Sequence, residues 1–160
     1  MAEYHIQAGK YLAQYAEKWG ISLGYENYDD RIIDKIGRKR FGYLFDIGHT
    51  ALSHPAIPHR DPSKDITAHT LQMIDERIDK TVEFHVHGVI RTEKEHDHQP
   101  LDKDNIIDYK QVIALLKGRD YKGPLVFEIL RQKNQWMNIA ETIEACRKAK
   151  QRLIEYEKSV

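Results

Sequence analysis

The chain has 160 residues, of which 41% are apolar, and this suits one folded domain with a buried core. Twenty-five basic residues balance twenty-five acidic ones, so no net field draws the chain to nucleic acid or to an anionic membrane surface. A single cysteine, no apolar stretch of membrane-spanning length and no leader-like pattern together predict a cytoplasmic protein without disulfides or membrane contact.

Helices and strands are expected to alternate along the chain, as judged from apolar periodicity and from glycine and proline breaks. In chain order, the sequence predicts a helix over 5–19, a strand over 21–27, a helix over 29–38, a strand over 41–46, a helix from 63 or 65 to 78, a strand over 81–87, a polar loop over 88–105, a helix ending at Gly118, a strand over 125–129 and a helix over 138–158.

This alternation predicts an α/β fold of one domain, residues 1–160, in which parallel strands are joined by right-handed crossovers. Four such units can form either a small open sheet or half of a (β/α)₈ barrel. The residues at the strand ends help to distinguish these two folds.

All four predicted strands end in a carboxylate or imidazole residue on the face opposite the bulky apolar side chains. Parallel strands bring their carboxyl ends to one rim, where the active sites of barrels lie. A divalent cation such as manganese or zinc would offset the repulsion between clustered carboxylates. We therefore expect a metal site, in which Asp46 contributes more to metal binding than to folding. The residues are Glu26, Asp46, His85 with His87, and Glu128.

Further polar residues are expected at the same rim. His49 follows Asp46 by three positions, and Gly48 between them would allow a tight turn. The triplet His96-Asp97-His98 could supply a second group of ligands or contact a substrate phosphate. The alternative interpretation is that the strand-end residues are ordinary rim carboxylates and hydrogen-bonded core histidines. Three other histidines are expected at the surface or in loops: His54, His59 and His69.

The strand ends resemble those of the xylose isomerase-like superfamily, which includes sugar phosphate isomerases and epimerases and the endonuclease IV group. The resemblance covers nearly the whole chain and implies the C-terminal half of a TIM barrel, with strands five to eight. It rests on five segments: Leu23-Gly24-Tyr25-Glu26-Asn27, Phe45-Asp46-Ile47-Gly48-His49, Phe84-His85-Val86-His87, Asp97-His98-Gln99-Pro100-Leu101 and Leu125-Val126-Phe127-Glu128.

The resemblance also implies roles for individual residues. The implied metal ligands are Glu26, Asp46, His87 and Glu128, with His85 competing with His87 for the third place. Glu26 and Glu128 would in addition move a proton at the carbon beside a substrate carbonyl. The implied substrate contacts are His49, His85 and His98.

The activity implied is that of a divalent-metal-dependent isomerase or epimerase of a small sugar or sugar phosphate. The alternatives are a metal-dependent phosphodiesterase, similar to the endonuclease IV group or to a cobamide-remodelling enzyme, and an inactive half-barrel that serves as an assembly module. A half-barrel exposes its sheet edges. We therefore expect either a fragment of a longer protein or a homodimer, in which a second copy supplies the complementary half-barrel.

Overall fold

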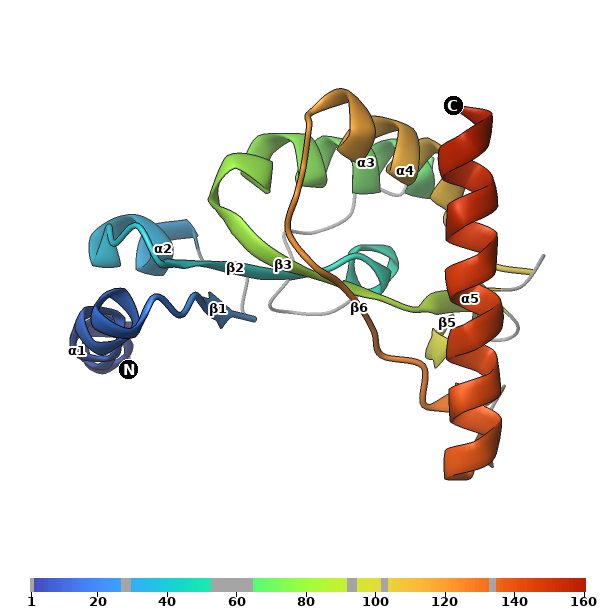
Figure 1. Ribbon diagram of the computed structural model, residues 1–160, viewed down its shortest axis with the longest axis horizontal. Helices are drawn as coiled ribbons and strands as arrows, with labels where there is room; N and C mark the ends of the chain where they lie inside the picture. The colour runs from blue at the N-terminus through green and yellow to red at the C-terminus, as the bar shows by residue number, and fades with distance from the viewer. Residues whose placement is uncertain (1, 27–29, 53–64, 92–94, 102–103, 133–134) are drawn as a thin grey trace.

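The computed structural model describes residues 2–26, 30–52, 65–91, 95–101, 104–132 and 135–160. Four parallel strands form one sheet in the order β1-β2-β3-β6, and helices follow the strands (Figure 1). The strands are β1 (Leu23–Tyr25), β2 (Phe41–Asp46), β3 (Thr81–Val86) and β6 (Leu125–Phe127). The helices are α1 (Ala2–Trp19), α2 (Asp30–Ile36), α3 (Ile66–Arg77), α4 (Tyr109–Gly118) and α5 (Ile139–Ser159).

Two antiparallel hairpins and two short 3₁₀ helices complete the described part of the chain. The hairpins are β4–β5 (Gly88–Arg91 with Glu95–Gln99) and β7–β8 (Arg131–Gln132 with Gln135–Trp136). The 3₁₀ helices are η1 (Gly48–Ala51), directly after β2, and η2 (Ile78–Lys80), directly before β3. Both hairpins follow a parallel strand, so they lie at the carboxyl edge of the sheet.

Side-chain caps define where the longer helices begin. The Asp65 carboxylate accepts a hydrogen bond from Ala68 N before α3, and Asp108 accepts from Lys110 N before α4. Asn138 and Glu141 form a reciprocal capping box at the start of α5. These caps satisfy amide groups that have no partner inside a helix and so fix the helix starts.

The core lies between the sheet and the helices α3 and α4, which cover one face of the sheet in Figure 1. Phe45 of β2 and Phe84 of β3 are fully buried and meet edge to face, with ring centroids 5.5 Å apart. Fully buried Ile74 and Val112 belong to α3 and α4. The predicted alternation is therefore correct in these strands, because their aromatic side chains face the helices.

The predicted α/β fold and the order of the four parallel strands are confirmed. The predicted polar loop over 88–105 is wrong in part, because it contains the β4–β5 hairpin. His69, expected at the surface, is buried on α3. His54 and His59 lie outside the described residues.

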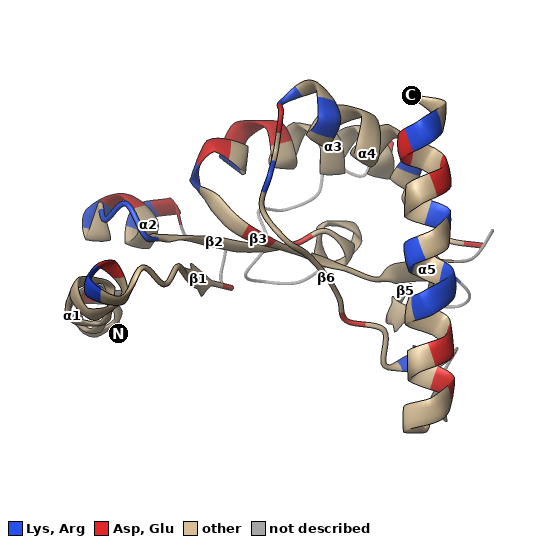
Figure 2. Ribbon diagram, viewed as in Figure 1, with Lys and Arg blue, Asp and Glu red and all other residues tan. Residues whose placement is uncertain are grey.

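Acidic and basic residues are intermixed along α5 and over the other helices in Figure 2. This distribution agrees with the balanced composition of the sequence. Within the described ranges, no helix combines the length and the apolar character needed to cross a membrane.

Candidate metal centre

The register of the sheet brings the four strand ends together. Asp46, the last residue of β2, lies opposite His85 of β3, and His85 in turn lies opposite Val126 of β6. Glu128 follows two residues after Val126, and Glu26 directly follows β1. Because the strands are parallel, these residues leave the sheet at the same edge.

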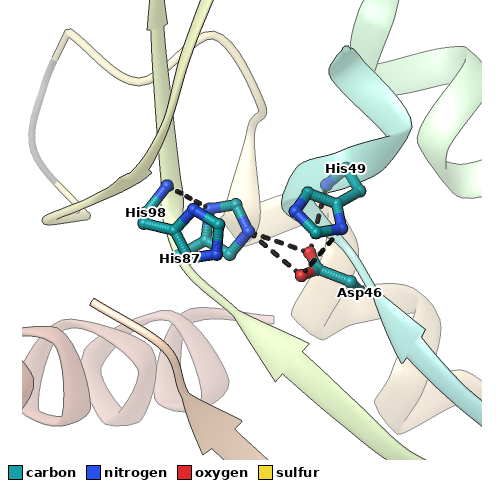
Figure 3. Close-up of side chains that lie close together, drawn as sticks. All are labelled: Asp46, His49, His87 and His98. Carbon is teal, nitrogen blue, oxygen red and sulfur yellow. Dashed lines mark hydrogen bonds and ion pairs between the residues drawn. The ribbon is translucent and has the colours of Figure 1, made fainter. Parts of the chain in front are cut away.

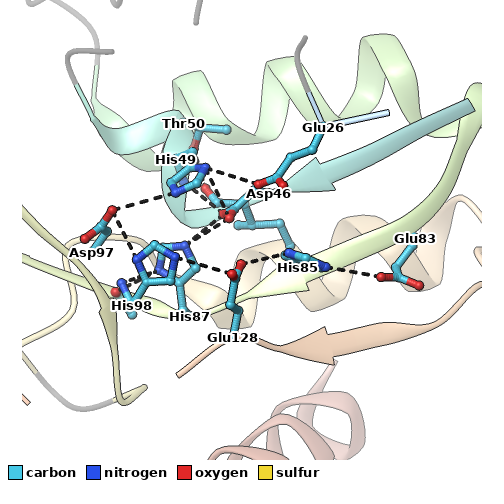
Figure 4. Close-up of polar contacts among 12 residues, drawn as sticks. Glu26, Asp46, His49, Thr50, Glu83, His85, His87, Asp97, His98 and Glu128 are labelled. Atoms are coloured by element: carbon cyan, nitrogen blue, oxygen red, sulfur yellow. Dashed lines mark hydrogen bonds and ion pairs between the residues drawn. The ribbon is translucent and has the colours of Figure 1, made fainter. Parts of the chain in front are cut away.

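One donor atom from each strand end lies within reach of a single cation. The atoms are all within 4.8 Å of one another, and we call this set the first donor group: Glu26, Asp46, His85 and Glu128 (Figure 4). The closest contact in it joins Nδ1 of His85 to Oε2 of Glu128 at 2.8 Å. Three carboxylates and an imidazole are a donor set that manganese and zinc both accept.

Glu83 orients the imidazole of the first donor group. Its Oε1 atom lies 3.2 Å from Nε2 of His85, two residues along the same strand (Figure 4). A carboxylate on the far nitrogen of a histidine is the usual support for a metal ligand, since it fixes the ring and raises its basicity. The alternation of side chains in β3 predicted that Glu83 shares the face of His85, but the sequence alone did not indicate this role.

Three histidines and Asp46 form the second donor group: Asp46, His49, His87 and His98 (Figure 3). The donor atoms of this group also lie within 4.8 Å of one another. The imidazoles of His87 and His98 are stacked, with ring centroids 4.4 Å apart and an interplanar angle of 10°. The two groups share Asp46, so the described residues offer room for either one cation or two.

His87 is fully buried and its ring nitrogens already have protein partners. Nε2 lies 2.9 Å from Asp46, and the backbone N–H of His98 donates to Nδ1 at 2.9 Å. A neutral imidazole satisfies both contacts when Nε2 carries the proton. The chain turns tightly here, as expected, in the 3₁₀ helix that begins at Gly48. A Cβ at Gly48 would collide with the His87 ring, so this glycine also provides space for the ring.

Asp46 is also fully buried, and its carboxylate accepts hydrogen bonds from His87 Nε2 and from the backbone N–H of His49. Burial by itself would raise the pKa of Asp46, but the hydrogen bond from His87, followed by the electrostatic attraction of the neighbouring imidazoles, outweighs it and lowers the pKa below its usual value. The charged carboxylate therefore stabilises the metal-free fold as well. The expectation that Asp46 contributes more to metal binding than to folding stays a prediction, and the hydrogen bonds that Asp46 accepts indicate a contribution to the fold as well.

A bound cation would stabilise the first donor group electrostatically. Partial burial, followed by the negative charges of Asp46 and Glu128, raises the pKa of Glu26 above its usual value, although nearby imidazoles act in the opposite direction. A divalent cation would relieve this repulsion between carboxylates. The residues present therefore fit the metal that the sequence predicted.

The β4–β5 hairpin brings Asp97 and His98 to the same rim. His98 has a φ of 55°, in the left-handed region that a residue with a Cβ rarely adopts. The imidazoles of His49 and His98 hold the pKa of Asp97 far below its usual value, and Asp97 raises the pKa of His98. His96, which the sequence grouped with them, lies on β5 and belongs to neither donor group.

Comparison with known proteins identifies the family to which this architecture belongs. A family model described as xylose isomerase-like TIM barrel matches residues 4–149. No curated protein sequence matches the chain significantly.

Solved structures of this architecture superpose on nearly the whole chain. A xylose isomerase domain protein from Planctomyces limnophilus has a TM-score of 0.68 at 14% identity, and the match covers 97% of this chain and 53% of that one. An IolI protein with a bound zinc atom has a TM-score of 0.61 at 15% identity, with 96% and 56% covered. A D-allulose 3-epimerase from Methylomonas sp., in complex with D-allulose, has a TM-score of 0.54 at 18% identity, with 88% and 46% covered. The chain thus spans about half the length of these proteins, and likeness at such identities shows the fold alone.

Proposed function

Since the chain belongs to the xylose isomerase-like TIM barrel family, we propose that it forms half of the barrel of a divalent-metal-dependent isomerase or epimerase. The substrate would be a small sugar or sugar phosphate. The observation that carries the proposal is the first donor group, in which one donor from each strand end lies within 4.8 Å of the others. The zinc-bound IolI protein and the epimerase with bound D-allulose support a metal and a sugar, respectively.

Glu26, Asp46, His85 and Glu128 would hold the cation. His85 is preferred over His87, because its side chain is partly exposed and contacts Glu128 of the first donor group, whereas His87 is fully buried and its Nδ1 atom accepts from the backbone N–H of His98. His87 instead positions Asp46. The bound cation would polarise a substrate carbonyl and offset the negative charge that develops when a neighbouring proton leaves.

Glu26 and Glu128 would carry that proton. They follow β1 and β6, the two outer strands of the described sheet, so a substrate bound at the cation would contact one carboxylate from each outer strand. The raised pKa of Glu26 makes its carboxylate a stronger base than an isolated one, which suits a group that takes up a proton and returns it. His49 and His98, which border the first donor group, would contact substrate hydroxyl or phosphate oxygens.

The sheet needs a complementary half to close the barrel. The edge strand β6 exposes Val126, and a groove of about 740 Å³ beside it runs between α4 and α5 and is lined by Leu125, Phe127 and Ile154. At the other edge, α1 exposes several large side chains: Tyr4, Tyr11, Leu12, Tyr15 and Trp19. We propose that a second copy of this chain or the other half of a longer protein covers these surfaces.

A phosphodiesterase is the second candidate, and the shared Asp46 is the observation that favours it. Two donor groups joined by one carboxylate could hold two cations, and pairs of cations activate water against phosphodiesters in other enzymes. The balanced charge of the chain, with acidic and basic residues intermixed along the helices of Figure 2, favours a small phosphodiester over a nucleic acid as the substrate of this alternative.

Two measurements on the protein with its barrel complete test the proposal. The first is metal content by elemental analysis, for which we expect one manganese or zinc per site. The second is exchange of a substrate proton with deuterium from the solvent, followed by NMR on ketose and aldose sugars and their phosphates. Two cations per site with hydrolysis of a small phosphodiester would instead establish the second candidate, and neither metal nor activity would leave an inactive assembly module.

A further inference from the structure

Arg131 lies at the edge of the candidate metal centre, although neither the sequence motifs nor the proposed proton transfer includes it. It begins the β7–β8 hairpin, three residues after Glu128. Leu130 N donates to the carbonyl of His98 at 3.0 Å, which holds this hairpin against the segment that carries Asp97 and His98.

The guanidinium of Arg131 is held in place mainly by contacts other than hydrogen bonds. Its Cζ atom lies 4.3 Å from the centre of the Trp136 ring, across the hairpin. Nη1 lies 3.8 Å from Oδ1 of Asp97, which is close enough for attraction but beyond a hydrogen bond. Nε is buried and has no hydrogen-bond partner among the described residues.

Asp97 does not neutralise Arg131 fully, because it is engaged on its other side. Its Oδ2 atom lies 3.1 Å from Nδ1 of His98 and 3.7 Å from Nε2 of His49, so the carboxylate is shared with two imidazoles. The Arg131 side chain remains 39% exposed. The rim therefore presents a guanidinium that is positioned in advance and has donors available to a ligand.

We propose that Arg131 binds a phosphate group of the substrate. A planar guanidinium donates two parallel hydrogen bonds to phosphate, and stacking on an aromatic ring reduces the freedom that it loses on binding. The first donor group attracts cations, so an anionic substrate needs a separate positive group at the rim, whereas a neutral sugar does not. This inference rests on the proposed function and narrows its substrate class to phosphorylated compounds, either sugar phosphates or phosphodiesters.

Binding of inorganic phosphate tests the inference directly, with Trp136 as the reporter. The chain has two tryptophans, so Trp19→Phe leaves a single fluorophore that stacks on Arg131. Phosphate should change the fluorescence of this variant, both in EDTA and after zinc loading. Adding Arg131→Met should weaken phosphate binding about tenfold or more, as expected when a charge-assisted hydrogen bond is lost. Arg119→Met is the matched control, because Arg119 pairs with Asp75 and Asp79 on the helical side.

Equal phosphate affinity in the Arg131→Met and Arg119→Met proteins would overturn the inference. Failure of the Trp19→Phe protein to bind phosphate, both in EDTA and after zinc loading, would also overturn it. If Arg131→Met does not fold, Arg131→Gln, which keeps polarity without charge, replaces it. The affinities for three compounds then distinguish the possible sources of the phosphate: fructose 6-phosphate represents the sugar phosphates, bis(4-nitrophenyl) phosphate represents the phosphodiesters, and fructose is the control without phosphate. The zinc content of the same samples tests the proposed function independently, because Arg131 belongs to neither donor group.

Discussion

Nε2 of His87 lies 2.9 Å from Oδ1 of Asp46, and neither side chain is exposed to solvent. His85, two residues earlier on the same face of β3, instead contacts Glu128 and Glu83 and is partly exposed. Burial therefore distinguishes His87, which lies in the protein interior just after β3, from His85 of β3, which is partly exposed.

Substitution of His85 should mainly affect metal binding, whereas substitution of His87 should mainly affect the stability of the metal-free protein. We expect His85→Gln to weaken zinc binding strongly and to change the thermal midpoint of the metal-free protein little. His87→Leu should lower metal-free stability by about 1–3 kcal/mol, because the Asp46 carboxylate and the His98 amide both lose a buried partner. Zinc titration and thermal unfolding in EDTA measure the two effects. Zinc affinity lost only in His87→Leu would show that His87 is the ligand.

Asp46→Asn should weaken both metal binding and folding. The carboxylate belongs to both donor groups, and its lowered pKa means that the charged form stabilises the native state. We expect the free energy of unfolding in EDTA to fall by about 1–3 kcal/mol. Asp34→Asn is the control, because Asp34 is exposed and pairs with Lys80. An unchanged midpoint for Asp46→Asn would mean that this carboxylate serves the metal alone.

The metal-free protein should show a pH-dependent contribution from Asp97 and its imidazole partners. The lowered pKa of Asp97 gives stability that is present above about pH 4 and is lost as the pH falls further. The raised pKa of His98 gives stability that is full below about pH 6.5 and is lost as the pH rises through the folded value. The contribution is therefore largest between these limits.

Asp97→Asn should accordingly reduce the thermal midpoint in EDTA more at pH 5.5 than at pH 8.5. Asp79→Asn is the control, because Asp79 is largely exposed beside Arg119. Its effect on the thermal midpoint should be nearly the same at pH 5.5 and at pH 8.5. An equal effect of Asp97→Asn at both pH values would mean that the imidazoles do not carry a positive charge beside it.

The 160-residue chain on its own should associate in solution. Both outer strands have an unpaired edge within the described sheet, α1 exposes large apolar side chains, and the groove beside β6 is lined in part by Leu125, Phe127 and Ile154. Light scattering at tens of micromolar should give the mass of a dimer, and Val126→Lys on β6 should shift the protein toward monomer. Ile143→Lys, on the exposed surface of α5, is the control for added charge. A stable monomer with cooperative unfolding would contradict this prediction.

The order of the strands and the inner face of each were accessible from the sequence. The alternation of Phe45 with Asp46, and of Phe84 with His85, indicates a side that packs on helices and a side that does not, because strand periodicity is local. Parallel crossovers then place the ends of all four strands on one rim. Glu26, Asp46 and Glu128 could therefore be grouped before any coordinates were known.

Only the tertiary structure distinguishes His85 from His87 as a candidate ligand. Both residues share one face of the same strand, and the difference arises from residues remote in sequence: Glu128 and Glu83 reach His85, whereas Asp46 and the backbone of His98 surround His87. The β4–β5 hairpin and Arg131 were also missed, because short polar strands carry little periodic signal. Which side chains meet across such hairpins depends on long-range packing, and local pattern does not contain that information.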